Sequence, residues 1–195
     1  MNKWMMVGTA MAVALAACSK PNDEADNNTG AIGNAAMSDN TAADADASAS
    51  ATAPVAAGDF ANMVAASDRF EIESGRLAAS KASSAEVKSF AQMLVTDHQK
   101  SSAELKTVAS QSSPAIVPDD EIDPEKQGML GMLQSANGAD FDRQFIDQQI
   151  AAHEKALSLL QNYAAAGDNE ALRGFATKAA TVVQGHLDKA RSLKK

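Results

Sequence analysis

The residues best suited to chemistry in this sequence are its three histidines, His98, His153 and His186. Each lies on or beside an apolar stripe that repeats at steps of three and four residues, which is typical of the buried face of a helix. They fall on three different helices, about 15, 13 and 17 residues from the short-loop end of the bundle, so at ~1.5 Å per residue their depths agree within about 6 Å. Because imidazole nitrogens bind Zn, Cu and Fe, the pattern predicts a divalent-metal site in the core.

Three further polar residues are candidates to complete this site. Glu71 is the acidic residue nearest the histidine layer on the inward stripe of the first helix, so it is predicted as a carboxylate ligand. Asp97 stands beside His98, and Gln149 lies one turn before His153. Both are predicted to orient imidazoles through hydrogen bonds, as polar groups around metal-binding histidines commonly do.

Two structural alternatives to the metal site remain open. Buried histidines often serve only as hydrogen-bonded core residues, with Glu71 facing solvent and Asp97 paired with Lys100. The three rings also fail to converge if the helices are rotated differently, because sequence does not determine helix rotation.

Several classes of catalytic site are excluded. Di-iron oxidases of the ferritin type need Glu-x-x-His on two helices, yet Val95, Ile150 and Val183 occupy the third position before the three histidines. The sequence also has no glycine-rich phosphate loop and no nucleophile motif of the hydrolase type. No catalytic residue is therefore assigned.

The histidines must be positioned by long helices. Helical periodicity predicts long helices over residues 59–80, 83–110, 139–166 and 168–195, and a short one beginning at Pro124. Ser83 and Asp168 are expected to cap the second and last long helices, and Asp123 the short one. Strand patterns are absent from the sequence.

The loop lengths predict how these helices connect. The first two long helices and the last two are joined by short loops, whereas the link between the pairs is long. This order favours an all-α, ferritin-like antiparallel four-helix bundle with a short helix in the crossover. A plain up-and-down bundle with a helical insertion is the alternative.

The amino terminus indicates export. Residues 1–17 have the charged start and short apolar run of a signal peptide. The end of this run, "LAAC" at Leu15–Cys18, resembles the bacterial lipoprotein box, which implies lipidation of Cys18 and a membrane anchor. Ser19 then resembles an outer-membrane address facing the periplasm. Residues 18–58 are read as the lipidated cysteine and a disordered tether, and residues 59–195 as the folded domain.

The amino-acid composition limits the classes of molecule that this chain can bind. The net charge is −8, and no basic cluster interrupts the acidity, so nucleic-acid binding is excluded. We expect contact with the membrane through the lipid on Cys18, and an envelope protein as a possible partner.

Three segments resemble a bacterial family of unknown function whose members are often labelled predicted outer-membrane proteins. They are "FEIESGRLAASKASSAEVKSFAQMLVTDHQKSSAEL", "GADFDRQFIDQQIAAHEKALSLL" and "GHLDKA". The most specific matches are Asp97-His98, Phe141-Asp142 and His153. The resemblance implies a ferritin-like bundle in the envelope but no established activity, and the Leu-Pro usual before the last histidine is missing here.

Two functions follow as hypotheses. The first is a non-catalytic interaction or stress-related module of the envelope. The alternative is a metal-binding or metal-dependent redox protein with a histidine-rich site in the bundle core.

Overall fold

The computed structural model describes residues 55–194, which form five helices: α1 Ala57–Lys81, α2 Ala85–Ser110, α3 Pro124–Ser135, α4 Gly138–Ala166 and α5 Glu170–Leu193. Within this range there is no strand, only an isolated bridge between Ala82 and Gly138. The predicted all-helical class, with four long helices and one short helix, is confirmed. The signal peptide, Cys18 and nearly all of the tether lie outside the described residues.

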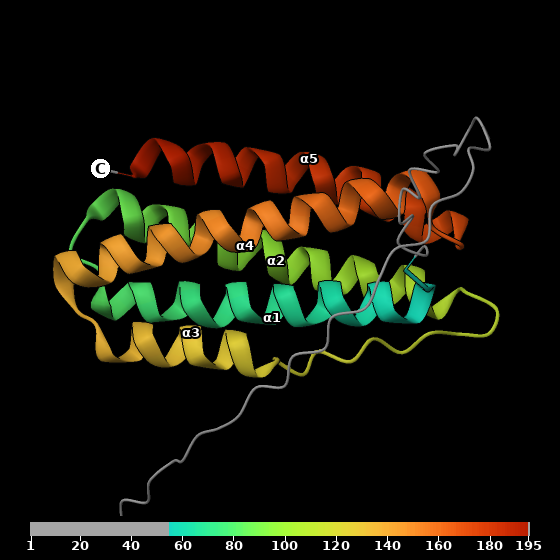
Figure 1. Cartoon of the computed structure of the whole chain (residues 1–195), viewed down its shortest axis with the longest axis horizontal. Coiled ribbons are helices and arrows are strands. Elements are labelled where there is room, and N and C mark those ends of the chain that lie inside the picture. Colours follow the sequence, from blue (N-terminus) through green and yellow to red (C-terminus); the bar gives the residue numbers. More distant parts are fainter. Residues whose placement is uncertain (1–54, 195) are drawn as a thin grey trace, which may run out of the picture. The chain divides into compact units, whose positions relative to one another are not determined.

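The long helices form two hairpins that pack against each other (Figure 1). The first hairpin is α1 with α2 and the second is α4 with α5, while α1 also packs on α4 and α2 on α5. The chain passes from α2 to α4 by a long crossover that runs back along α1 and includes α3 (Figure 1). This is the short–long–short order of connections that the loop lengths predict. No helix in residues 55–194 combines the length and apolar composition needed to cross a bilayer.

Two of the expected helix caps are wrong by one residue. Ser84, not Ser83, caps α2 by accepting a hydrogen bond from the backbone of Val87. Ser83 donates instead to Asp142 at the start of α4, which also accepts from the Ser84 N–H at 2.9 Å. Asp142 therefore ties the α1–α2 turn to the second hairpin, and that tie draws Ser83 away from the helix end.

The second correction concerns the turn between α4 and α5. Asn169 caps α5 by accepting from the Leu172 N–H. Asp168 accepts from the Tyr163 hydroxyl at 2.9 Å and from the Ala57 N–H at 3.3 Å, so it links this turn to the start of α1. The cap at Asp123 is present as predicted, with Pro124 in the first turn of α3.

Two apolar clusters hold the bundle at its opposite ends. One lies toward the α1–α2 turn and the other toward the α4–α5 turn, where the rings of Phe60 and Tyr163 stack with centroids 3.8 Å apart. Burying each large side chain contributes on the order of 1.5–3 kcal/mol. The first cluster includes Phe90, Leu94, Phe141 and Phe145, and the second Phe60, Leu105, Leu160, Tyr163 and Leu172. The histidines occupy the layer between these clusters.

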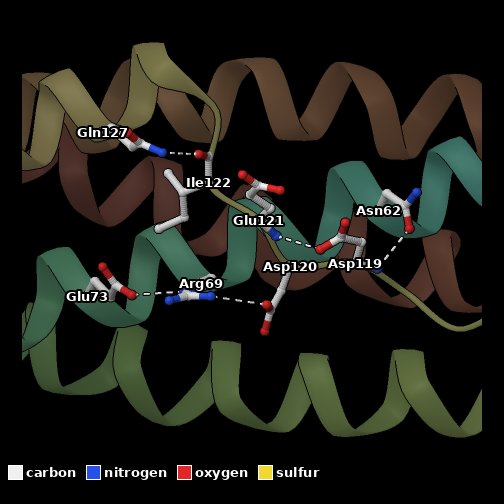
Figure 2. Close-up of polar contacts among 8 residues, drawn as sticks. All are labelled: Asn62, Arg69, Glu73, Asp119, Asp120, Glu121, Ile122 and Gln127. Carbon is white, nitrogen blue, oxygen red and sulfur yellow. Dashed lines mark hydrogen bonds and ion pairs between the residues drawn. The ribbon is translucent and has the colours of Figure 1, made fainter.

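Residues 111–123, which we call the crossover strap, are fastened along α1 (Figure 2). The Asn62 side chain accepts from the Asp119 N–H at 2.8 Å, and Arg69 pairs with Asp120 at 3.2 Å while also bonding Glu73. Ile122 is buried against the bundle at the end of the strap. Ile116 also packs against the second apolar cluster, so apolar and polar contacts together hold the strap in place.

Candidate metal centre

The structure brings the three histidines together. His98 comes from α2, His153 from α4 and His186 from α5, and their exposed fractions are 6, 2 and 4 %. One nitrogen from each ring lies within 4.8 Å of the other two. The ring centroids are 5.4–5.7 Å apart. The convergence expected from their similar depths is therefore present.

The ring of His98 is oriented from α1. Its Nδ1 lies 2.8 Å from Oδ1 of Asp68, a carboxylate that is only 3 % exposed. The other oxygen of Asp68 accepts from the Ser102 hydroxyl at 3.1 Å. Because a carboxylate accepts, Nδ1 of His98 donates, and the lone pair of the neutral ring lies on Nε2.

The ring of His153 is oriented by its own helix. Nδ1 donates to the backbone carbonyl of Gln149 at 2.8 Å, so the lone pair again lies on Nε2. Gln149 was predicted to orient an imidazole, and it does so through its carbonyl rather than its amide. The amide of Gln149 instead donates to Ser74 at 3.2 Å.

The ring of His186 has the opposite orientation. Its Nε2 lies 2.9 Å from Oδ2 of Asp97, so the lone pair lies on Nδ1. Asp97 was predicted to orient an imidazole, and the ring it contacts is His186 across the bundle rather than its neighbour His98. Among the described residues Asp97 pairs with His186 and not with Lys100, the partner named in the structural alternative.

The second nitrogen of each ring, which makes no hydrogen bond, is the atom available to bind a metal. Nε2 of His98, Nε2 of His153 and Nδ1 of His186 are buried and have no hydrogen-bond partner within the described residues. Leaving a buried polar atom unpaired costs roughly 1–3 kcal/mol. Each ring thus uses one nitrogen for orientation and leaves a lone pair in the shared layer, which is how metal-binding histidines are typically arranged.

Glu71 lies beside this group without joining it. The residue is 1 % exposed, so the alternative in which it faces solvent is wrong. Its Oε1 is 3.8 Å from Nδ1 of His153, the nitrogen that donates to the Gln149 carbonyl. Its donor atoms are not among those that meet in the histidine group of the described residues. Burial raises the pKa of Glu71 to about 7.

The pKa values of the rings reflect burial and neighbouring charge. Burial, followed by the charge of His98, lowers the pKa of His153 to about 3. Burial also lowers the pKa of His186. Burial acts in the same direction on His98, but its bond to Asp68 and the charge of Glu71 together outweigh it, so its pKa is raised. At neutral pH His153 and His186 therefore have free lone pairs.

A cavity of about 700 Å³ reaches the histidine layer. All four long helices, the crossover strap and the start of α3 contribute to its walls, and His98 and His186 line it at the level of the triad. Its walls include an apolar group, Ala152, Ala156, Leu160, Phe175, Ala179 and Val183, and charged side chains such as Lys155 and Lys178.

Sequence reasoning missed Asp68. Its place on the first helix, three residues before Glu71, puts both carboxylates on one face. An aspartate is seldom buried without a partner, so a sequence pattern ordinarily assigns it to the solvated face. The only sequence signal for Asp68 is that a polar residue lies beside an apolar stripe. Periodicity alone does not show whether such a residue is buried or solvated.

Comparison with known proteins adds a family and a fold. Residues 40–193 match the family model described as "Domain of unknown function (DUF4142)". No curated protein matches the chain.

Solved structures of CopM share the fold. Its Cu(II)-bound form is 21 % identical with a TM-score of 0.62, and the match covers 72 % of this chain and 97 % of that one. Its apo form is 22 % identical with a TM-score of 0.56, covering 68 % and 91 %. At such identity the similarity establishes the helical fold alone. Because the family model spans most of the sequence, this chain belongs to the DUF4142 family of domains of unknown function.

Proposed function

We propose that the bundle binds one divalent transition-metal ion, preferentially copper, through His98, His153 and His186. Two observations carry this proposal: one nitrogen from each ring lies within 4.8 Å of the other two, and each ring has one buried nitrogen without a hydrogen-bond partner. A purely structural role explains a histidine with one satisfied nitrogen, but it does not explain why three such rings meet. A bound ion would remove three desolvation penalties at once.

The geometry requires little rearrangement. Metal–nitrogen bonds are ~2.0–2.1 Å long, so nitrogens within 4.8 Å of one another must move inward by less than about 1 Å each. One nitrogen of each ring is already held by a hydrogen bond, to Asp68, the Gln149 carbonyl or Asp97, and this leaves the second nitrogen for the metal. Metal binding therefore requires only a small movement of the three histidine side chains.

The surrounding charge supports a divalent ion. Asp68 and Asp97 each accept a hydrogen bond from one of the rings, so two carboxylates stand directly behind the nitrogen donors. Two negative charges balance a dipositive ion that neutral imidazoles alone leave uncompensated. Hydrogen bonds from ligand histidines to carboxylates also raise the basicity of the imidazole.

The preference for copper rests on two arguments. Imidazole sites generally bind Cu²⁺ more tightly than Zn²⁺ or Fe²⁺, following the Irving–Williams order. The structures of CopM, which share this fold, include Cu(II)-bound and Cu(I)-bound forms. We take this likeness as a reason to test copper first, with Zn and Fe as competitors.

The remaining sequence expectations stand as part of the same proposal. The domain would be a ferritin-like bundle tethered to the outer membrane by lipid on Cys18 and facing the periplasm, where an envelope protein is a possible partner. The non-catalytic interaction module gains no specific observation from residues 55–194, and a chain that binds no metal would favour it.

Single-histidine variants test the site. Zinc and copper binding are measured by calorimetry for the full chain and for H98Q, H153Q and H186Q, with Q99A on the exposed face of α2 as the control. Each histidine variant should weaken binding at least about tenfold, because each removes one of three donors, while Q99A should bind like the parent chain. Since Cys18 is common to all variants, differences among them report on the triad. Equal affinity in all five proteins would exclude this site.

A further inference from the structure

A metal ion held by the three histidines needs a further ligand to complete its coordination. Zinc and copper sites in proteins commonly take four ligands, and sites that react or exchange keep one position open. The triad supplies three nitrogens. Among the described residues, no fourth His, Cys, Asp or Glu donor joins the group in which they meet.

Glu71 is the nearest candidate, and its position argues against it. Its carboxylate approaches Nδ1 of His153, a nitrogen already donating to the Gln149 carbonyl. Its oxygens are not among the donor atoms of the described residues that all lie within 4.8 Å of one another, so Glu71 does not supply the fourth ligand in this arrangement.

The cavity approaches the same site from another direction. It is lined by His98 and His186 but not by His153. Its volume of about 700 Å³ falls within the ~300–1,000 Å³ typical of small-molecule sites. The cavity is thus large enough for more than solvent.

We propose that this cavity admits an exogenous small molecule that fills the fourth coordination position of a metal held by the triad. This inference rests on the proposed metal site. The molecule has one neutral nitrogen or sulfur donor and an apolar body.

The walls define that chemical class. Ala152, Ala156 and Ala179 leave space because their side chains are small, and Leu160, Phe175 and Val183 make the surface apolar. An apolar body is therefore favoured over a polar one. Asp68 and Asp97 already balance a dipositive ion, so an anionic donor gains no net attraction and a neutral donor is preferred.

The test uses Co²⁺, whose visible spectrum reports changes in coordination. The full chain is loaded with Co²⁺ and titrated with imidazole, 4-phenylimidazole and azide. Both imidazoles should change the spectrum, and 4-phenylimidazole should bind at least about tenfold more tightly because the cavity buries its second ring. Azide should bind most weakly.

Two matched variants locate the binding path. A179F places a large side chain in the cavity, whereas A103F places the same side chain on the exposed face of α2, away from it. A179F should retain Co²⁺ and lose the advantage of 4-phenylimidazole, while A103F should keep both.

The outcomes separate the two proposals. A parent chain that binds no Co²⁺ refutes the metal site itself. A Co²⁺ spectrum that no added molecule changes, or equal affinity for the two imidazoles, overturns the cavity inference and leaves the metal site standing. These comparisons use the parent chain, so they hold even if A179F folds poorly.

Discussion

Replacing Asp68 with Asn removes a charge that the structure places directly behind the metal site. The carboxylate is 3 % exposed and accepts from Nδ1 of His98 at 2.8 Å and from the Ser102 hydroxyl at 3.1 Å. D68N keeps the side-chain shape but turns a charge-assisted hydrogen bond into a neutral one, which is about half as strong. The loss is on the order of 1–2 kcal/mol.

In binding terms, D68N should lower metal affinity about tenfold, within the 10–100-fold range typical of groups that orient ligand histidines. The assay is competitive titration of Zn²⁺ or Cu²⁺ against a chelator of known affinity at constant pH. D120N is the matched control, because it removes the same charge from an exposed position. Asp120 lies on the crossover strap, its side chain is 48 % exposed, and it pairs with Arg69 of α1.

D120N should change affinity by less than about threefold, since screened surface charges contribute little. If D68N binds metal as tightly as the parent chain, or if D120N weakens it equally, the carboxylate behind His98 does not tune the site. The inference that the hydrogen bond from His98 to Asp68 strengthens metal binding would then be refuted.

Three further predictions concern pH, the role of Glu71 and helix packing. Metal affinity should fall on acidification through neutral pH, because the raised pKa of His98 lets a proton compete for Nε2; a chelator titration at several pH values measures this. E71Q should leave Zn²⁺ affinity within about threefold of the parent, because the Glu71 oxygens are not among the donor atoms that meet in the histidine group of the described residues; loss of binding in calorimetry would restore it as a ligand. G75A should cost roughly 1–3 kcal/mol in denaturant unfolding, because its Cβ would lie 2.7 Å from a Val95 methyl group; an unchanged midpoint would contradict this close contact.

The helices and their order could be predicted from sequence because each signal is local. Apolar periodicity identifies the long helices, and Asp123 with Pro124 gives the start of α3. The caps at Ser83 and Asp168 were misplaced because both residues bond to distant parts of the chain, Ser83 to Asp142 and Asp168 to Ala57. The propensity of a residue type for a helix cap gives no information about hydrogen bonds to distant parts of the chain.

The candidate site was predictable in outline and not in detail. The depths of the histidines along their helices gave the layer in which they meet, because helical rise is constant. Which carboxylate contacts which ring depends on helix rotation and on packing across the bundle. That is why Asp97 was identified but not its partner His186, why Asp68 was missed, and why Glu71 was named as a ligand although its oxygens are not among the atoms that meet in the histidine group of the described residues.

The central claim is most directly tested by the metal content of the protein. The full chain and a variant carrying H98Q, H153Q and H186Q are equilibrated with Cu²⁺, dialysed, and measured by elemental analysis. Because Cys18 is present in both, the difference isolates the triad. We predict that the parent retains one more metal ion per chain than the triple variant. Equal metal content in the two proteins would contradict the account.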